Sequence, residues 1–566
     1  MRQLYLFFLA LVALPALVSR AETAVAQTDW QFGVIEAYDA PQAAASLGVG
    51  WTRIKFQWAD VQAAGPESWT PKVSDAQIEA ELAAGRMVVG LLIGIPDWAR
   101  DPNRLPQGLW LPPNDPGNTW AEFVRTAVAR YAGRIDHWII WNEPDIDIDA
   151  IAHTWDGNVD DFYQLQRTAY LVAKETNPDA IIHLAAFTYW ADVYAGREQY
   201  MARLLDRILA DPAAYRHNHY FDVATAHLYF QPNQIYDLVT LFRDIMAQRG
   251  LDKPLWLVET NAPPHDDPSW RVPNWTLSVT VNEQAAFMPQ AVAAALAAGA
   301  QRIGVYKLID TPDDRAANPE PFGLLRLDGS RRPAFITYQV AIRMLGGATE
   351  ATRERWNEVG QIRVTQADRT TTVLFARLPL PQRAQVTAVA SEALLIDMWG
   401  SARRITAVDG VFTVELQPAL CTQPIGDYCM IGGTTYYLVQ ARDGSAPPVD
   451  PPPPASPPAI VTATVAPTAT AAPTATPPPT STATTTPPVL AAAPPTGVAP
   501  MAVAPTGVAP TGLAPMAVAP TATPPTAALT RAPQTVAGQT GLLLLGAGVL
   551  SALVLGLLWR RMAPRP

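Results

Sequence analysis

The stretch 137-HWIIWNEPD-145 places a run of apolar residues directly before two carboxylate side chains. A short apolar run of this kind, closed by turn-forming residues, is typical of a strand that is buried on both faces. Seven further runs, rich in Val, Ile, Trp and Phe, occur between residues 31 and 308. We therefore predict eight strands, at residues 31–35, 51–56, 87–93, 137–141, 181–186, 223–229, 255–259 and 303–308.

An amphipathic stretch follows each run, with apolar residues recurring at intervals of three and four. The predicted helices cover residues 41–47, 75–84, 119–132, 159–176, 197–209, 233–248, 282–298 and 332–345. Thr119 and Glu122 have the spacing of a capping box. Eight strand–helix units predict a (β/α)8 TIM barrel over residues 27–346. A doubly wound open sheet is the alternative, but no Gly-rich phosphate loop follows any predicted strand.

The hydrophobic pattern changes to a period of two after residue 347, which is typical of strands with one buried face. Six strands are predicted there, at residues 361–365, 371–378, 384–388, 394–399, 411–416 and 434–440. Turn residues such as Asp409 and Gly410 separate some of them. Residues 347–445 are therefore expected to form a small antiparallel β-sandwich with a structural role.

Both ends of the chain differ in composition from the part between them. Residues 1–26 have the charge, apolar stretch and small-residue cleavage site of a secretory signal peptide. Residues 446–540 are dominated by Pro, Ala and Thr and predict a disordered, extended stalk. Residues 541–559 are uncharged and long enough for one transmembrane helix. The arginines in residues 560–566 predict a short cytoplasmic tail.

This order of segments predicts a protein that is anchored to the membrane by its C-terminal helix and faces the extracellular side. The layout fits a bacterial cell surface. Cys421 and Cys429 could pair across a short loop in such a compartment, although the spacing alone leaves the bond open.

The composition excludes several classes of partner. The 566 residues carry a net charge of −10, and acidic and basic residues are mixed along the first 445 positions, which disfavours a nucleic acid partner. Two cysteines cannot form a four-cysteine zinc site. His217, His219 and the run 265-HDD-267 lie in predicted loops without a third placed ligand, so we expect no metal and no cofactor.

Two glutamates stand where predicted strands end. Glu143 follows strand four and Glu259 ends strand seven. The C-terminal ends of barrel strands carry the active sites of TIM barrels. Two carboxylates on opposite sides of a narrow barrel can face one sugar ring, as the acid/base and nucleophile of a retaining glycosidase do.

These motifs resemble those of clan A glycoside hydrolases. The run 141-WNEP-144 is similar to the acid/base motif of the clan, and Glu259 stands at its nucleophile position. The runs 96-PDWA-99 and 323-GLLRLDGS-330 resemble families 39 and 5 most closely. The resemblance covers about residues 30–345, and a trailing sandwich also occurs in the clan. It implies a retaining hydrolase of β-linked extracellular oligo- or polysaccharide, with Glu143 as acid/base and Glu259 as nucleophile.

The resemblance also implies roles for residues that bind the substrate or support the two glutamates. Asn142 would hydrogen-bond the sugar 2-hydroxyl, and Arg53 would hold the nucleophile ionised. His227 and Tyr229 resemble the His-x-Tyr pair that lies beside the nucleophile. Trp98 is expected to be a stacking platform for a sugar ring.

The end of strand eight departs from the clan pattern. Clan members usually carry a tryptophan there, whereas this chain has Tyr306 followed by Lys307. Tyr306 is expected to replace the tryptophan beneath the substrate. Lys307 or Arg197 could recognise a carboxylate-bearing sugar.

Two other functions fit the same residues. A catalytically inactive barrel would be a carbohydrate-binding surface protein, and a transglycosylase would use the same glutamates with a sugar as acceptor. The sequence leaves open the sugar, the linkage, exo or endo action and the oligomeric state.

Overall fold

The computed structural model describes residues 29–146, 153–275, 277–317 and 320–445. Eight parallel strands close into a barrel, with β1 paired to β8 and each other strand paired to its sequence neighbours. Their bounds are β1 (Asp29–Val34), β2 (Val49–Gln57), β3 (Met87–Ile93), β4 (His137–Ile140), β5 (Ile181–Phe187), β6 (Val223–His227), β7 (Leu255–Thr260) and β8 (Arg302–Val305). These are the eight predicted strands, and the predicted barrel is confirmed.

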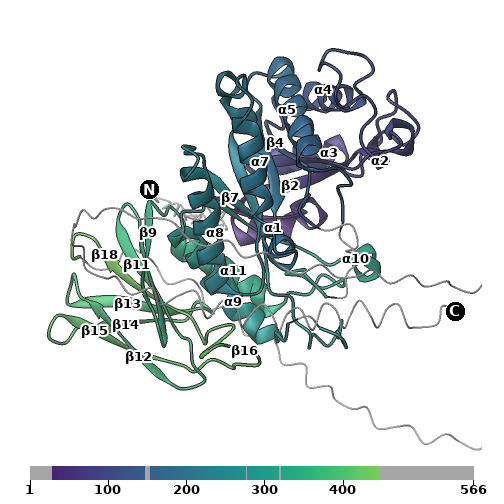
Figure 1. Cartoon of the computed structure of the whole chain (residues 1–566). Coiled ribbons are helices and arrows are strands. Elements are labelled where there is room, and N and C mark those ends of the chain that lie inside the picture. Colours follow the sequence, from purple (N-terminus) through teal and green to yellow (C-terminus); the bar gives the residue numbers. More distant parts are fainter. Residues whose placement is uncertain (1–28, 147–152, 276, 318–319, 446–566) are drawn as a thin grey trace, which may run out of the picture. The chain divides into compact units, whose positions relative to one another are not determined.

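The eight predicted helices surround the strands (Figure 1). They are α1 (Pro41–Leu47), α3 (Asp75–Ala83), α4 (Thr119–Tyr131), α5 (Val159–Thr176), α7 (Tyr200–Leu209), α8 (Pro232–Ala247), α9 (Val281–Ala297) and α11 (Pro333–Leu345). The short elements α2 (Trp58–Val61), α6 (Trp190–Tyr194), α10 (Pro312–Ala317), η1 (Ala37–Asp39), η2 (Asp97–Ala99) and η3 (Ala214–Tyr220) were not predicted. Most of these short elements follow a barrel strand, so they build the loops at the C-terminal end of the barrel.

The start of α4 differs from the prediction. Its N-cap is Asn118, whose side-chain oxygen accepts a hydrogen bond from Ala121 N at 3.0 Å. Thr119 is the first helical residue, and its hydroxyl donates to the carbonyl of Gln107 at 2.9 Å. The predicted capping box of Thr119 and Glu122 is therefore wrong, because an asparagine that caps well stands one residue earlier.

Large aromatic side chains fill the barrel below the strand ends. Trp51 on β2 and Trp256 on β7 are buried, with ring centroids 5.6 Å apart. Gly33 on β1 makes room for them, since a Cβ there would lie 2.2 Å from Trp51. The interior is thus a packed core, and only its C-terminal mouth remains available for a site.

The C-terminal part forms the predicted antiparallel sandwich. A six-stranded sheet has the order β14-β13-β18-β11-β10-β9, and β12 pairs with β15. The bounds are β9 (Glu350–Trp356), β10 (Val359–Thr365), β11 (Arg369–Ala376), β12 (Gln382–Thr387), β13 (Glu392–Asp397), β14 (Ala402–Thr406), β15 (Val411–Leu416), β16 (Pro424–Ile425), β17 (Tyr428–Cys429) and β18 (Tyr436–Ala441). The sequence missed β9 and β14, because both are half-exposed edge strands rich in charged residues.

A disulfide joins Cys421 to Cys429 in the hairpin of β16 and β17. Polar contacts connect this region to α9. The amide of Gln290 donates to the carbonyl of Gly433 at 3.0 Å, and Thr422 N donates to Glu283 Oε1 at 3.0 Å.

Within the described ranges, no helix combines the length and apolar character that crossing a membrane requires. The predicted signal peptide, stalk, transmembrane helix and tail (residues 1–26 and 446–566) lie outside these ranges.

Candidate active site

A cavity of about 870 Å³ opens at the C-terminal ends of the barrel strands. The loops after β1, β2, β3, β4 and β8 contribute most of its wall, and Glu143 and Glu259 both line it. Besides the two glutamates, eleven other charged side chains lie in this lining: Glu36, Asp39, Arg53, Lys55, Lys72, Arg100, Arg104, Asp156, Lys307, Asp313 and Asp314. A cavity of this size and polarity suits a polar small molecule or a short segment of a polymer.

Glu143 reaches the cavity through an unusual backbone. Trp141 and Glu143 have φ values of 72° and 47°, in the left-handed region that side chains other than glycine seldom adopt. Hydrogen bonding to β5 holds this segment, because Glu143 N donates to the carbonyl of Ala186 at 3.1 Å. Strained residues of this kind cluster at functional sites. Glu36 after β1, Tyr189 after β5 and Phe230 after β6 share the feature.

Glu259 on β7 is tightly held. Arg53 Nη2 lies 2.5 Å from its Oε1, and the two side chains are 7% and 8% exposed. The hydroxyl of Tyr229 donates to its Oε2. Arg53 lies on β2, so residues from opposite sides of the barrel meet at this carboxylate.

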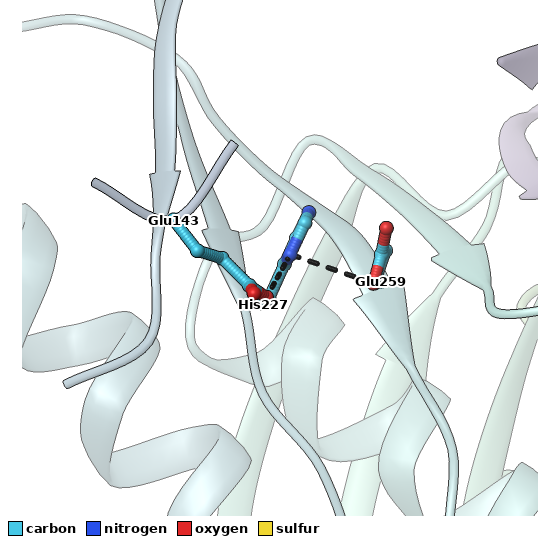
Figure 2. Close-up of side chains that lie close together, drawn as sticks. All are labelled: Glu143, His227 and Glu259. Atoms are coloured by element: carbon cyan, nitrogen blue, oxygen red, sulfur yellow. Dashed lines mark hydrogen bonds and ion pairs between the residues drawn. The ribbon is translucent and has the colours of Figure 1, made fainter. Parts of the chain in front are cut away.

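His227, the last residue of β6, lies between the two glutamates (Figure 2). Its Nδ1 is 2.6 Å from Glu143 Oε1 and 3.4 Å from Glu259 Oε2. One oxygen of each glutamate and this imidazole lie within 4.8 Å of one another. Retaining glycosidases place their two carboxyl groups about 5–5.5 Å apart, whereas inverting enzymes need about 6.5–9.5 Å. The 4.8 Å limit applies to the nearest oxygens of the two carboxyl groups, and it leaves less room between them than the inverting arrangement needs.

The surroundings of Glu259 favour its ionised form. Burial acts to raise the pKa of this carboxyl, but the charges of His227 and Arg53 and the hydrogen bond from Tyr229 outweigh it, so the pKa is lowered. Burial and the charge of Glu259 raise the pKa of Tyr229 well above its usual range. Tyr229 therefore remains a hydrogen-bond donor at neutral pH.

Glu143, His227 and Glu259 are also close enough to offer one ligand atom each to a metal ion. Arg53 and Tyr229 already occupy both oxygens of Glu259 as donors. A guanidinium in contact with a ligand carboxylate would oppose a divalent cation at the same place. The donor set therefore suits proton transfer and nucleophilic attack better than metal binding.

The other predicted residues have different placements. Asn142 and Tyr306 line the cavity with the two glutamates. Trp98 does not belong to its lining: the indole NH donates to the carbonyl of Gln62 at 2.7 Å, and the ring packs edge-on against Trp58. The structure thus places Trp98 in the packing around α2, and the predicted stacking platform is corrected on this point.

Both cations that were considered for an acidic sugar are already paired. Lys307 lies in the cavity wall at 3% exposure, where its Nζ contacts Glu36 and lies 2.9 Å from Asp314. Arg197 binds Asp192 outside this cavity and lines a neighbouring depression instead. Neither geometry favours recognition of a carboxylate.

Sequence reasoning missed Lys55, Glu36 and Tyr38, which also line the cavity. Lys55 could have been found, because residues two apart in a strand share a face and Arg53 points inward. Lys55 is exposed, and no partner for its amine is seen among the described residues. Glu36 and Tyr38 come from the loop after β1, whose path follows from tertiary contacts rather than from a sequence pattern.

Neither a protein-family model nor a curated protein sequence matches this chain. In structure, the chain is similar to a family 39 glycoside hydrolase from the gut symbiont Bacteroides cellulosilyticus WH2, with a TM-score of 0.52 and 15% identity over 72% of this chain and 81% of that chain. A glucosidase from Croceicoccus marinus gives a TM-score of 0.51 and 13% identity over 73% of this chain and 96% of that chain. At such low identity the likeness concerns the fold. The chain therefore has the fold of these two glycosidases, and the resemblance to family 39 is confirmed at that level.

Proposed function

We propose that the protein is a retaining glycoside hydrolase, with Glu259 as nucleophile and Glu143 as acid/base. The observation that carries this proposal is the approach of the two carboxylates within 4.8 Å at the mouth of the barrel, with His227 between them. The likeness in fold to two glycosidases supports it.

The proposed reaction has two displacements. Glu259 attacks the anomeric carbon while Glu143 donates its proton to the leaving oxygen, so the glycosidic bond breaks and a glycosyl–Glu259 ester forms. Glu143, now a carboxylate, takes a proton from water as the water oxygen attacks the anomeric carbon. The ester breaks, the sugar departs with its original anomeric configuration, and both glutamates return to their starting states.

The surroundings of the two carboxylates support this division of roles. Glu259 is 8% exposed and contacts Arg53 and Tyr229, which keep it ionised and aimed. Glu143 is 16% exposed, which gives it access to the leaving group and to water. The side chain of Asn142 has no hydrogen-bond partner among the described residues, so it is available for a sugar hydroxyl.

Chemical rescue tests the proposal. The wild type would be screened on 4-nitrophenyl β-glycosides and on polysaccharides, and the best substrate would then be used with Glu259→Gly and Glu143→Gly. Azide should restore turnover in both variants, giving a glycosyl azide of inverted configuration with Glu259→Gly and of retained configuration with Glu143→Gly.

Glu175→Gln is the matched control, since Glu175 is exposed near the end of α5 and far from the strand ends. Full activity in either glutamate variant would refute the assignment. Sugar binding without turnover in the wild type would favour the carbohydrate-binding alternative, and transfer to a sugar acceptor would favour a transglycosylase.

We further propose that the enzyme acts at the extracellular face of the membrane, tethered by residues 541–559. The signal-like residues 1–26 and the Pro/Thr-rich residues 446–540 support this location. The Cys421–Cys429 disulfide suits an oxidising compartment. Protease treatment of intact cells should release the activity, and a chain ending at residue 540 should be secreted. Activity that is retained in the cytoplasm would contradict the proposal.

A further inference from the structure

A second, smaller pocket of about 230 Å³ adjoins the main cavity, and Glu143 lines both. The loops after β5 and β6 and the start of α8 form most of its wall. Its lining consists of Glu143, Thr188, Trp190, Tyr194, His227, Leu228, Tyr229, Phe230, Gln231, Gln234, Leu238 and Leu277. The carboxyl of Glu143 therefore stands at the boundary between two compartments.

The two compartments differ in polarity. Thirteen of the 30 residues that line the main cavity are Asp, Glu, Lys or Arg, whereas Glu143 and His227 are the only side chains of charged type in the lining of the second pocket. Thr188 is polar, but its hydroxyl already donates to Asp145 Oδ2 at 2.8 Å. The other polar side chains of this lining are the amides of Gln231 and Gln234 and the hydroxyls of Tyr194 and Tyr229, of which the Tyr229 hydroxyl already donates to Glu259.

Aromatic rings give the second pocket a flat wall. Trp190 and Tyr194 lie one turn apart on α6 and stack with centroids 5.7 Å apart and an interplanar angle of 26°. Both rings are half-exposed, and Leu228 and Leu238 form a buried apolar part of the lining. This lining offers apolar contact and ring stacking, and few hydrogen bonds.

We propose that this pocket is the leaving-group subsite and that it takes an apolar, ring-bearing aglycone. The inference rests on the proposed function of Glu143 as the acid. A general acid must lie within hydrogen-bond reach of the oxygen that leaves, so the leaving group has to lie on the side of Glu143 away from the bound sugar. The polar cavity would then hold the sugar that is transferred to Glu259.

The chemistry of the lining selects the class of aglycone. A sugar in the leaving-group position carries several hydroxyls, and each hydroxyl that is buried without a hydrogen bond costs free energy. An aromatic or other planar apolar group loses little there and gains stacking against Trp190 and Tyr194. The substrate class is therefore a β-glycoside of an aryl or similar apolar alcohol. The bond that is cleaved joins the sugar to this aglycone.

The test compares substrates that share one sugar and differ in the leaving group. The sugar is the one with the highest kcat/KM among 4-nitrophenyl β-glycosides. The full-length protein is then assayed on its 2-naphthylmethyl glycoside, its methyl glycoside and its glycosyl fluoride. Fluoride and methanol carry no ring or long apolar group that could stack on Trp190 and Tyr194.

Trp190→Ala should lower kcat/KM for the naphthylmethyl glycoside about tenfold more than for the fluoride, since one ring contact is removed. Trp190→Phe should restore most of this selectivity. Trp30→Ala is the matched control, because Trp30 is 51% exposed and packs under Arg302 at the opposite end of the barrel. This control should not change the ratio between the substrates.

Failure of the inference and failure of the proposed function would give different results. Equal losses on all three substrates in Trp190→Ala, or a wild-type preference for a disaccharide over the naphthylmethyl glycoside, would show that the pocket does not select an apolar aglycone while the hydrolase assignment stands. Absence of turnover on every substrate, the fluoride included, would refute the proposed function itself. The ratio of kcat/KM between substrates within one variant also controls for misfolding, because a poorly folded protein loses activity on all substrates together.

Discussion

Replacing Arg53 by methionine tests the electrostatic control of the nucleophile. The substitution removes the guanidinium that lies 2.5 Å from Glu259 and keeps an unbranched apolar side chain in its place. Two unit charges about 4 Å apart in a medium of effective dielectric constant about 20 attract by about 4 kcal/mol. Tyr229 and His227 remain as partners of Glu259 and compensate in part. Since each 1.36 kcal/mol corresponds to a factor of ten, we expect kcat/KM to fall about 10²–10³-fold at neutral pH.

The pH profile gives the sign of the effect. In the proposed mechanism Glu259 attacks only when it is ionised, and Arg53 is one of the groups that lower its pKa. Without Arg53 the pKa of this carboxyl rises. As the pH is lowered, the variant should therefore lose activity at a higher pH than the wild type does. The acidic limb of the kcat/KM profile of Arg53→Met should therefore be shifted to higher pH relative to that of the wild type.

Arg86→Met is the matched control. Arg86 forms another buried arginine–glutamate pair, at 2.6 Å from Glu81, just before β3 at the opposite end of the barrel. Breaking a buried pair costs about 3–5 kcal/mol of stability in either variant. Thermal melting should therefore show similar destabilisation, while only Arg53→Met changes the acidic limb. An unchanged limb in Arg53→Met, or the same shift in Arg86→Met, would refute the reasoning.

Three further predictions concern stability and positioning. Burial raises the pKa of Asp145 from 3.8 to about 6, so its ionisation destabilises the fold increasingly as the pH rises through this range. In denaturant titrations between pH 4 and 7, the free energy of unfolding of Asp145→Asn should exceed that of the wild type by up to about 3 kcal/mol, with the difference growing with pH. A pH-independent difference would contradict this. Replacing Cys421 and Cys429 by serine should lower the free energy of unfolding by about 2–3 kcal/mol in thermal unfolding and leave kcat/KM unchanged, because the bond closes a short loop away from the cavity. A large loss of activity in the folded variant would be inconsistent with that placement. Tyr229→Phe should lower kcat/KM about 10–100-fold through loss of one hydrogen bond to a charged group, and an effect below twofold would argue against the contact.

The strands and the two glutamates at strand ends were readable because local patterns encode them. An apolar run that ends in a carboxylate predicts both a buried parallel strand and a side chain at its C-terminal end, as Glu143 and Glu259 illustrate. The roles of Arg53, His227 and Tyr229 were implied by the resemblance to clan A glycoside hydrolases and not by a local pattern. The structure brings all five together.

The residues that sequence reasoning misplaced depend on contacts between segments. Trp98 follows β3 as a platform residue would, yet its indole NH donates to the carbonyl of Gln62, directly after α2, and its ring packs against Trp58 on α2. Lys307 follows β8 as a free cation would, yet the loop after β1 supplies Glu36 to neutralise it. The apolar pocket was not predicted, because α6 has no pattern long enough to mark a helix.

The two glutamates differ in their surroundings, and this difference supports the proposed division of roles between nucleophile and acid/base. Glu259 is held by Arg53 on β2 and by Tyr229 just after β6, and it lines the polar cavity but not the second pocket. Glu143 contacts His227, stands on a strained turn after β4 and faces both compartments. Exchanging the roles would require the buried, cation-paired carboxylate to carry the proton, which the charges around it oppose. The leaving group would then also face a wall of charged side chains. Both considerations favour the proposed assignment, in which Glu143 lies between the sugar in the polar cavity and the leaving group in the second pocket.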